Sequence, residues 1–349
     1  MAHSDNLIQG MIKVFWRVVL VVALLAVVLW AELLLIELSH SRPQPMMLPP
    51  LYASDSGGAT QRPVSGDTNI FFIEPTCIFE EVPWFGLGTL QMCAVESAIR
   101  HNSEYHVYVL HTCAPPAEGF TVPDGAKAIY APTDFFFKDT DLDPSILTLY
   151  RFFGTEYSVQ HAKEVLSLVT LWKYGGIYLT LDYIIQRPLW GLGEDWIAAA
   201  GPKEVSLRAM SLSATPLSPG QQVAIEIVRR LHVDGGAPDG AVALVNSVLS
   251  ERCAFDQTDV SVEDCRGISI LPGELLLPVP ADLWQNLYME DLAEDMLSLV
   301  RDAYGVCFYH EMNEDLFPSP NSAYGRLGQW NCPSIFFGST GNDSSKRRR

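Results

Sequence analysis

The chain has 349 residues, of which 48% are hydrophobic and 18% charged, and its formal net charge at pH 7 is −18. This length allows one large folded domain or two smaller ones with appended segments, and the composition is that of a folded protein. The negative charge argues against nucleic acid as a partner, because the chain offers no basic surface to neutralise phosphates. The basic cluster Lys346–Arg349 ends a tail, residues 336–349, that we predict to be disordered.

The N-terminal part of the chain predicts a membrane anchor. Residues 14–36 are apolar except for Arg17 and Glu32, and about 20 such residues span the hydrocarbon core of a bilayer. Lys13 and Arg17 lie at the start of this segment, so the positive-inside rule places residues 1–13 in the cytosol and the rest of the chain in the lumen. A cleaved signal peptide is the alternative, but no small-residue cleavage site follows the apolar run.

A stem is predicted between the anchor and the folded part. Residues 37–68 hold five prolines and a Ser-Gly-Gly run, and such a composition cannot bury enough apolar area to fold. A short cytosolic tail, one anchor, a stem and a lumenal domain are typical of single-pass type II proteins of the Golgi membrane. This layout indicates a location more than a chemistry.

The cysteines agree with a lumenal location. All seven follow the stem, in the part of the chain that an oxidising compartment would expose. Because seven is odd, at least one thiol stays unpaired or pairs between chains. Cys253 and Cys265 are close enough in sequence to bridge a loop, but the spacing leaves the connectivity open.

The folded domain is predicted to cover residues 69–335 and to be of the α/β class. Apolar runs typical of strands lie at 70–73, 105–110, 128–130, 177–179 and 305–309. Helical spacing is found at 90–100, 159–174, 222–231, 241–249 and 292–300. The alternation of strands and helices predicts a mostly parallel sheet with a nucleotide-binding half. Residues 201–220 are rich in Ser and Pro and are predicted to be loops.

The segment 171–187 carries the main candidate site. Tyr174 ends a predicted helix, Gly175 and Gly176 turn the chain, and the strand that follows leads to Asp182. Glycine allows a tight turn and a close approach of the backbone to a ligand. A carboxylate at the C-terminal end of a buried strand lies where open α/β sheets bind ligands.

Short blocks spread along the folded part carry a resemblance to a known family. They are FFIE at 71–74, MCAVESA at 92–98, HVYVL at 106–110, LWKYGGIYLTLDYII at 171–185, CRGI at 265–268, PVP at 278–280, AYGV at 303–306 and NCP at 331–333. In this order they resemble the α1,4-glycosyltransferase family across essentially all of residues 69–332.

The resemblance implies a fold, a reaction and a set of ligands. The fold would be GT-A-like, a single lumenal domain with a nucleotide-sugar half and an acceptor half. The reaction would be retaining transfer of Gal, GalNAc or GlcNAc from a UDP-sugar to a terminal galactose of a glycolipid or glycan, forming an α1,4 linkage. Mn²⁺ or another divalent cation would bridge the two phosphates of the donor. Other Golgi transferases or a second copy of the chain are candidate partners.

The resemblance also assigns site residues by position. Asp182 matches the second acid of the family's Asp-Xaa-Asp motif and is the predicted metal ligand. Nucleotide-sugar binding is assigned to Glu164, Tyr174, Gly175, Gly176 and Thr180, and catalysis to Asp239 and His310.

Several positions depart from the family pattern. Thr180 replaces the first acid of Asp-Xaa-Asp, Ser167 replaces an arginine, and Cys307 replaces a histidine. Together these changes predict altered donor use or loss of catalysis. Three hypotheses therefore stay open, namely an active transferase with a reduced metal site, an inactive relative that binds sugar nucleotides or partner transferases, and a non-enzymatic lumenal glycan-binding or scaffold protein.

Overall fold

The structure is a computed structural model that describes residues 62–66, 68–79, 86–114, 121–140, 142–148, 155–233, 240–253, 263–309 and 317–338. All of them belong to one compact unit, Leu48–Arg349. The predicted anchor (14–36), most of the stem (37–68) and most of the tail (336–349) lie outside the described residues, as do Asp239 and His310. Within the described ranges, the helices are too short or too polar to span a bilayer.

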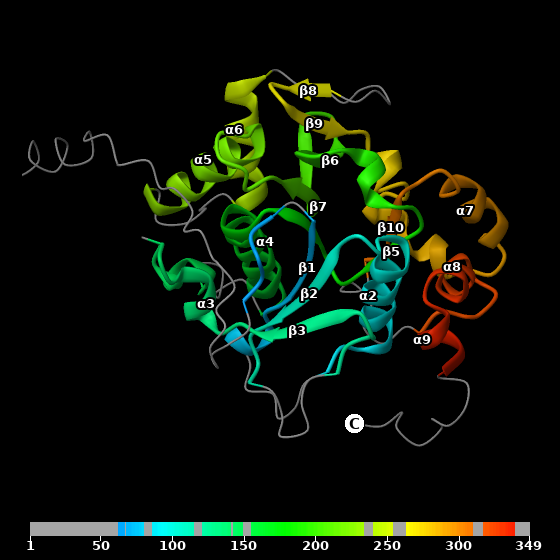
Figure 1. Ribbon diagram of the computed structural model, residues 1–349. Coiled ribbons are helices and arrows are strands. Elements are labelled where there is room, and N and C mark those ends of the chain that lie inside the picture. Colours follow the sequence, from blue (N-terminus) through cyan, green and yellow to red (C-terminus); the bar gives the residue numbers. More distant parts are fainter. Residues whose placement is uncertain are drawn as a thin grey trace, which may run out of the picture. The chain divides into compact units, whose positions relative to one another are not determined.

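An eight-stranded mixed sheet lies at the centre, with the strand order β3-β2-β1-β4-β7-β6-β9-β8 (Figure 1). Its strands are β1 (Asn69–Glu74), β2 (His106–His111), β3 (Ala126–Tyr130), β4 (Gly176–Leu179), β6 (Trp196–Gly201), β7 (Glu204–Leu212), β8 (Glu263–Cys265) and β9 (Ile268–Leu271). Strands β3, β2, β1 and β4 are mutually parallel. β7 runs antiparallel to β4 and to β6, and β6 is parallel to β9. The predicted mostly parallel sheet is thus confirmed, with the antiparallel pairs confined to its second half.

The helices flank this sheet, and a second, two-stranded sheet pairs β5 (Tyr183–Ile185) with β10 (Gly305–Cys307). The helices are α2 (Thr89–His101), α3 (Thr133–Phe137), α4 (Thr155–Tyr174), α5 (Pro219–Val233), α6 (Ala241–Arg252), α7 (Ala293–Leu299), α8 (Ala323–Asn331) and α9 (Pro333–Gly338). Short 3-10 helices lie at Thr76–Ile78, Pro144–Thr148, Leu189–Leu192, Gly273–Leu275 and Ala281–Tyr288. Figure 1 shows α4, α5 and α6 on one side and α2 with the C-terminal helices on the other.

The side chains of β1 pack against helices on both faces of the sheet. Ile70 and Phe72 belong to a core cluster that includes Val95 of α2, whereas the ring of Phe71 packs against that of Tyr174, the last residue of α4. Successive side chains of a strand point to opposite faces. Every residue of β1 is buried, which is the pattern of a parallel strand between two helical layers.

The prediction of loops at 201–220 is wrong for its first half, because β7 is a nine-residue strand between β4 and β6. Its sequence, EVSLRAMSL, alternates apolar and polar residues at Val205–Ala209, which is the strand period. The segment was predicted to be loops because of its serine content and the prolines at 216 and 219, and composition does not register this alternation. The correction matters because β7 carries Arg208 into the candidate site.

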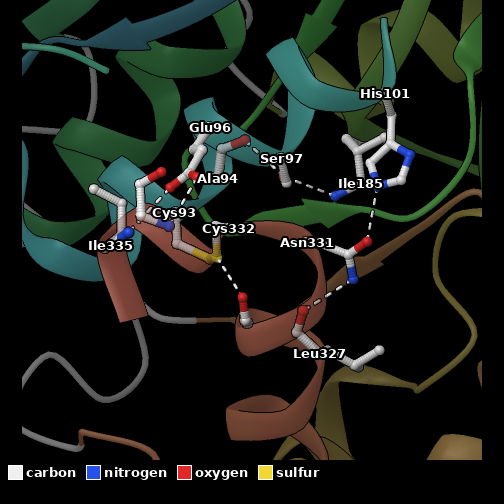
Figure 2. The surroundings of a disulfide bond; sticks show 12 residues. Cys93, Ala94, Glu96, Ser97, His101, Ile185, Leu327, Asn331, Cys332 and Ile335 are labelled. Carbon is white, nitrogen blue, oxygen red and sulfur yellow. Dashed lines mark hydrogen bonds between the residues drawn. A yellow bond between two sulfur atoms is a disulfide. The ribbon is translucent and has the colours of Figure 1, made fainter. Parts of the chain in front are cut away.

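Three disulfides account for six of the seven cysteines, pairing Cys77 with Cys113, Cys93 with Cys332, and Cys253 with Cys265. Cys307 is buried and lies outside these three disulfides, which agrees with the prediction that an odd number of cysteines leaves at least one without a disulfide partner in the same chain. Figure 2 shows that the Cys93–Cys332 bond ties α2 to the C-terminal helices. Beside it, the Glu96 carboxylate accepts hydrogen bonds from the backbone N–H groups of Ser334 and Ile335 at 3.0 and 3.1 Å.

Gly176 is required by the approach of β4 to β1. Its φ is +107°, and a Cβ at this position would lie 2.5 Å from the carbonyl oxygen of Asn69.

Replacing Gly176 with alanine is expected to lower the free energy of unfolding by about 1–3 kcal/mol, because the added Cβ would overlap the backbone of Asn69 and the left-handed φ would be strained. Urea unfolding measures the loss. Gly193→Ala is the control, since Gly193 has a φ of +80° but open space around it. Equal effects of the two variants would show that the contact with Asn69 carries no cost.

Candidate functional site

The strand order reverses between β1 and β4. The chain passes from β1 through α2 to β2 on one side, whereas β4 joins β1 on the other side. In open α/β sheets such a switch point, at the C-terminal ends of the strands, is where ligands bind. Glu74 ends β1 at this edge, and Thr180 and Asp182 follow β4. The sheet therefore places Asp182 where the sequence predicts a ligand site.

Both carboxylate oxygens of Asp182 are engaged by neighbouring side chains. Oδ1 accepts a hydrogen bond from the Thr180 hydroxyl. Oδ2 accepts one from the Arg208 guanidinium at 3.0 Å and lies 3.5 Å from the Cys307 sulfur. The Asp182 side chain is only 7% exposed. Its charge is thus balanced inside the protein by a fixed arginine.

Three strands hold these groups in place. β4 and β7 pair in a register that sets Leu179 opposite Ala209, and the Thr180 N–H donates to the Arg208 carbonyl at 2.9 Å. On the other side, the N–H of Phe308, directly after β10, donates to the Asp182 carbonyl at 2.9 Å. The cluster is therefore positioned by backbone hydrogen bonds rather than by side chains alone.

Tyrosines surround the cluster. The Arg208 guanidinium carbon lies 5.1 Å from the ring centre of Tyr309, whose hydroxyl donates to the Val279 carbonyl at 3.1 Å. Burial, with added repulsion from Cys307 and Asp182, raises the pKa of Tyr183 well above its ordinary value. Burial likewise raises the pKa of Tyr309. Both phenols are thus neutral at any physiological pH, and Arg208 and Asp182 carry the opposite charges of this cluster.

The described residues in contact with Asp182 do not fit a divalent cation. A hard cation such as Mn²⁺ prefers several oxygen ligands, but Asp182 brings a single carboxylate, and both of its oxygens already accept hydrogen bonds. Thr180 donates to that carboxylate and adds no charge. Within the described part of the chain, no group of three or more His, Cys, Asp or Glu side chains gathers in a metal-binding arrangement.

The Gly-Gly turn lies at the other end of β4. Gly176 begins the strand and Thr180 follows its last residue, so about four residues at roughly 3.3 Å each, some 13 Å, separate them. Tyr174 is buried, and its ring packs against Phe71 and Phe135. A nucleotide role for Tyr174, Gly175 and Gly176 stays a prediction, and structural packing alone accounts for Tyr174 and Gly176.

Glu164 and Ser167 lie on α4. The Glu164 carboxylate accepts a hydrogen bond from Gln160, one turn earlier, at 3.0 Å. Ser167 is fully buried, and its hydroxyl donates to the Glu164 carbonyl at 2.8 Å. The described contacts of these two side chains are therefore local to the helix, and the nucleotide role assigned to Glu164 stays a prediction.

Two matches to families of known proteins follow one another along the chain. The glycosyltransferase sugar-binding region containing DXD motif matches residues 88–201. The alpha 1,4-glycosyltransferase conserved region matches residues 239–337. Over these two regions the chain is similar to glycosyltransferases, and over residues 239–337 to the α1,4-glycosyltransferase family. In this chain, the position of the DXD motif in the first region reads Thr180-Leu181-Asp182.

Curated relatives agree with this family. Lactosylceramide 4-alpha-galactosyltransferase of Mus musculus is 26% identical over 273 residues, which cover 72% of this chain and 70% of that protein. The Homo sapiens protein of the same name is 26% identical over 268 residues, covering 70% of this chain and 69% of that protein.

Solved glycosyltransferase structures show more distant similarity. The galactosyltransferase LgtC in complex with donor and acceptor sugar analogs is 11% identical, with a TM-score of 0.36, covering 77% of this chain and 95% of that one. Mouse xyloside xylosyltransferase 1 is 9% identical, with a TM-score of 0.37, covering 72% of this chain and all of that one. The topology of this chain is defined by its own strand pairing.

Arg208 and Glu74 are site residues that the sequence prediction missed. Arg208 sits in the strand that was predicted as a loop, and only the β4–β7 register places it opposite Thr180. The Glu74 carboxylate accepts hydrogen bonds from the Thr76 N–H at 3.1 Å and from Gln91 at 3.3 Å. The signal for Glu74 was present, because an acid directly after a buried apolar run marks the C-terminal edge of a sheet.

Proposed function

We propose that this protein is a retaining transferase of the Golgi membrane with a GT-A-like lumenal domain. It moves a hexose or HexNAc (Gal, GalNAc or GlcNAc) from a UDP-sugar to a terminal galactose of a glycolipid or glycan and forms an α1,4 linkage. The observation that carries the proposal is the position of Asp182, at the strand-order switch point and inside the region matched to sugar-binding transferases. The curated relatives named as lactosylceramide galactosyltransferases support the choice of donor and acceptor class.

The chemistry sets what the site must supply. The bond between the anomeric carbon and the β-phosphate oxygen breaks, a bond to the acceptor hydroxyl oxygen forms, and the acceptor proton leaves. UDP departs with added negative charge, so a fixed positive group near the diphosphate stabilises the transition state. In this cluster Arg208 is that positive group, and Asp182 and the Tyr309 ring hold its guanidinium in position.

The cysteines and the N-terminal segment support the proposed compartment. Three disulfides are typical of a protein that folds in an oxidising compartment. The apolar segment 14–36 would anchor the chain with its folded domain in the lumen. Membrane glycolipids would then lie within reach of the domain, and other Golgi transferases or a second copy of the chain are the proposed protein partners.

A second candidate function is an inactive member of the family that binds a sugar nucleotide or a partner transferase without turnover. The observation that favours it is the closed state of Asp182, whose oxygens are both occupied and whose side chain is 7% exposed. Transfer assays separate the two candidates, because the inactive protein would bind UDP and leave every acceptor unchanged.

Asp182→Asn is expected to lower transfer at least about tenfold, because it removes the charge that pairs with Arg208 and so weakens a charge-assisted hydrogen bond. The assay follows radiolabel from UDP-Gal, UDP-GalNAc and UDP-GlcNAc onto a lactosyl acceptor, using the full chain in detergent. Asp302→Asn is the control, since Asp302 is exposed and pairs with Arg187 at 2.9 Å. Wild-type rates in the Asp182 variant would remove this residue from the site, and wild-type protein without transfer from any donor would favour the inactive candidate.

A further inference from the structure

We propose that Arg208 takes the place of the divalent cation in this protein, so that it binds the diphosphate of a sugar nucleotide without a metal. The inference rests on the proposed function, because it takes the switch-point edge of β1 and β4 as the sugar-nucleotide site. It concerns which group of that site compensates the negative charge of the diphosphate.

Charge balance supports the substitution. Two acids of an Asp-Xaa-Asp motif and one divalent cation sum to zero formal charge. In this chain Thr180 removes one negative charge, and Arg208 supplies one positive charge to the remaining acid, Asp182, at 3.0 Å. The Arg208–Asp182 pair is neutral as well, so within this pair the added arginine compensates for the absent cation.

Geometry opposes a metal at the same place. A cation bound to Oδ2 of Asp182 would lie at about 2.0–2.2 Å from it, on an oxygen that already accepts a hydrogen bond from the Arg208 guanidinium. The two positive charges would then be no more than about 5 Å apart, where repulsion is strong. A metal would have to displace Arg208. The single carboxylate of Asp182 would then bind it only weakly.

Arg208 is built to stay charged and in place. Its backbone N–H donates to the Ser206 hydroxyl of the same strand at 3.2 Å, and its carbonyl accepts a hydrogen bond from the Thr180 N–H at 2.9 Å. Its guanidinium lies over the Tyr309 ring. Arginine is always protonated, and its planar fork of donors matches phosphate oxygens. At 17% exposure against 7% for Asp182, the arginine is also the more accessible member of the pair.

The first test measures UDP binding by titration calorimetry with the full chain in detergent, once with EDTA and once with Mn²⁺. We expect dissociation constants that agree within about twofold. Binding that requires Mn²⁺ would overturn the inference and leave the proposed function standing. Absence of UDP binding under both conditions would overturn the inference and the proposed sugar-nucleotide site together.

The second test uses variants of the pair. Arg208→Ala is expected to weaken UDP binding in EDTA by about tenfold to a hundredfold, the loss of one charge-assisted contact. Arg187→Ala, which removes an exposed arginine paired with Asp302, is the matched control and should bind as the wild type does. Unweakened binding by Arg208→Ala would refute the role of Arg208.

Loss of folding is controlled in two ways. Thermal unfolding is recorded for each variant, and if Arg208→Ala unfolds, Arg208→Lys decides the question. Lysine keeps the charge but loses the planar fork, so intermediate, metal-independent binding supports the inference and wild-type affinity contradicts it. The double variant Thr180→Asp/Arg208→Ala restores two acids and removes the internal cation. It should bind Mn²⁺ in the absence of UDP and bind UDP only when Mn²⁺ is present. UDP binding by this variant without a metal would overturn the inference that Arg208 replaces the cation.

Discussion

Replacing Cys93 and Cys332 with alanine is expected to lower the free energy of unfolding by about 2–5 kcal/mol. The disulfide joins residues 239 positions apart, so the unfolded chain gains much conformational freedom when the bond is absent. In the chain-entropy view a loop of this length is worth about 5 kcal/mol, and the other two disulfides reduce that value because they already constrain the unfolded chain. The measurement is urea unfolding of the full chain under non-reducing conditions.

The control for this prediction is the double alanine variant of Cys253 and Cys265, which are 12 positions apart. The same entropy relation gives about 3 kcal/mol for so short a loop, so the Cys93–Cys332 variant should be the less stable of the two. A Cys93–Cys332 variant as stable as the wild type would contradict the prediction.

The position of this disulfide links stability to the site. Cys93 and Cys332 belong to the same core cluster as Ile184, Val306 and Phe308. Ile184 lies two residues after Asp182, Val306 pairs with Ile184, and the Phe308 N–H donates to the Asp182 carbonyl. The C-terminal helices thus hold β10 against β5, and the bond to α2 fixes the C-terminal helices themselves.

The first half of the fold was predictable because its elements are local and strongly patterned. Residues 70–73 and 177–179 are apolar runs bounded by polar residues or glycine, and they make up most of β1 and most of β4, respectively. β7 was not predictable by composition, because its serines alternate with apolar residues and a proline-containing loop follows at once. Its identity as a strand depends on pairing with β4 and β6, which lie before it in sequence.

The site was predictable only as far as neighbours in sequence are neighbours in space. Asp182 was found because it follows its strand directly. The Gly-Gly turn was assigned to the same site because it lies a few residues away, yet a strand of four residues separates them. Arg208, 26 positions after Asp182, contacts it only because β7 folds back along β4.

The expectation of a divalent cation illustrates the same limit. It came from the resemblance to a motif with two acids, and Thr180 already marked the loss of one. The sequence alone did not indicate that the positive side chain of Arg208 contacts the remaining acid, Asp182. A degenerate motif is therefore best interpreted together with the strand that pairs beside it, since that strand decides which charge faces the surviving acid.

Lys173 makes a further prediction, because it is a charged side chain with 1% exposure. Its ammonium group donates hydrogen bonds to the carbonyls of Phe135, at 3.3 Å, and Lys138, at 2.6 Å. Burial lowers the pKa of Lys173 from 10.5 to about 8, and the nearby charge of Asp139 opposes part of that effect. The folded protein therefore releases the Lys173 proton at a lower pH than the unfolded chain does.

The stability of the protein should consequently rise with pH above neutrality. The unfolded chain keeps the Lys173 proton up to about pH 10.5, whereas the folded protein releases it near pH 8. Since the unfolded state then binds more protons, the free energy of unfolding increases across this window, by roughly 3 kcal/mol in total and by about 2 kcal/mol between pH 7.5 and 9.5. Above pH 10 the effect is opposed, because burial raises the pKa of Tyr183 and Tyr324 and unfolding would let them ionise.

Urea unfolding at pH 7.5 and 9.5 tests this effect in the wild type and two variants. Lys173→Met removes the titrating group, and Lys173→Arg keeps a positive charge throughout the window. Both variants should lack the rise, although the arginine variant should be the less stable because its charge stays buried at every pH. If Lys173→Met still gained about 2 kcal/mol between the two pH values, another group would have to supply the pH dependence, and the assignment to Lys173 would be wrong.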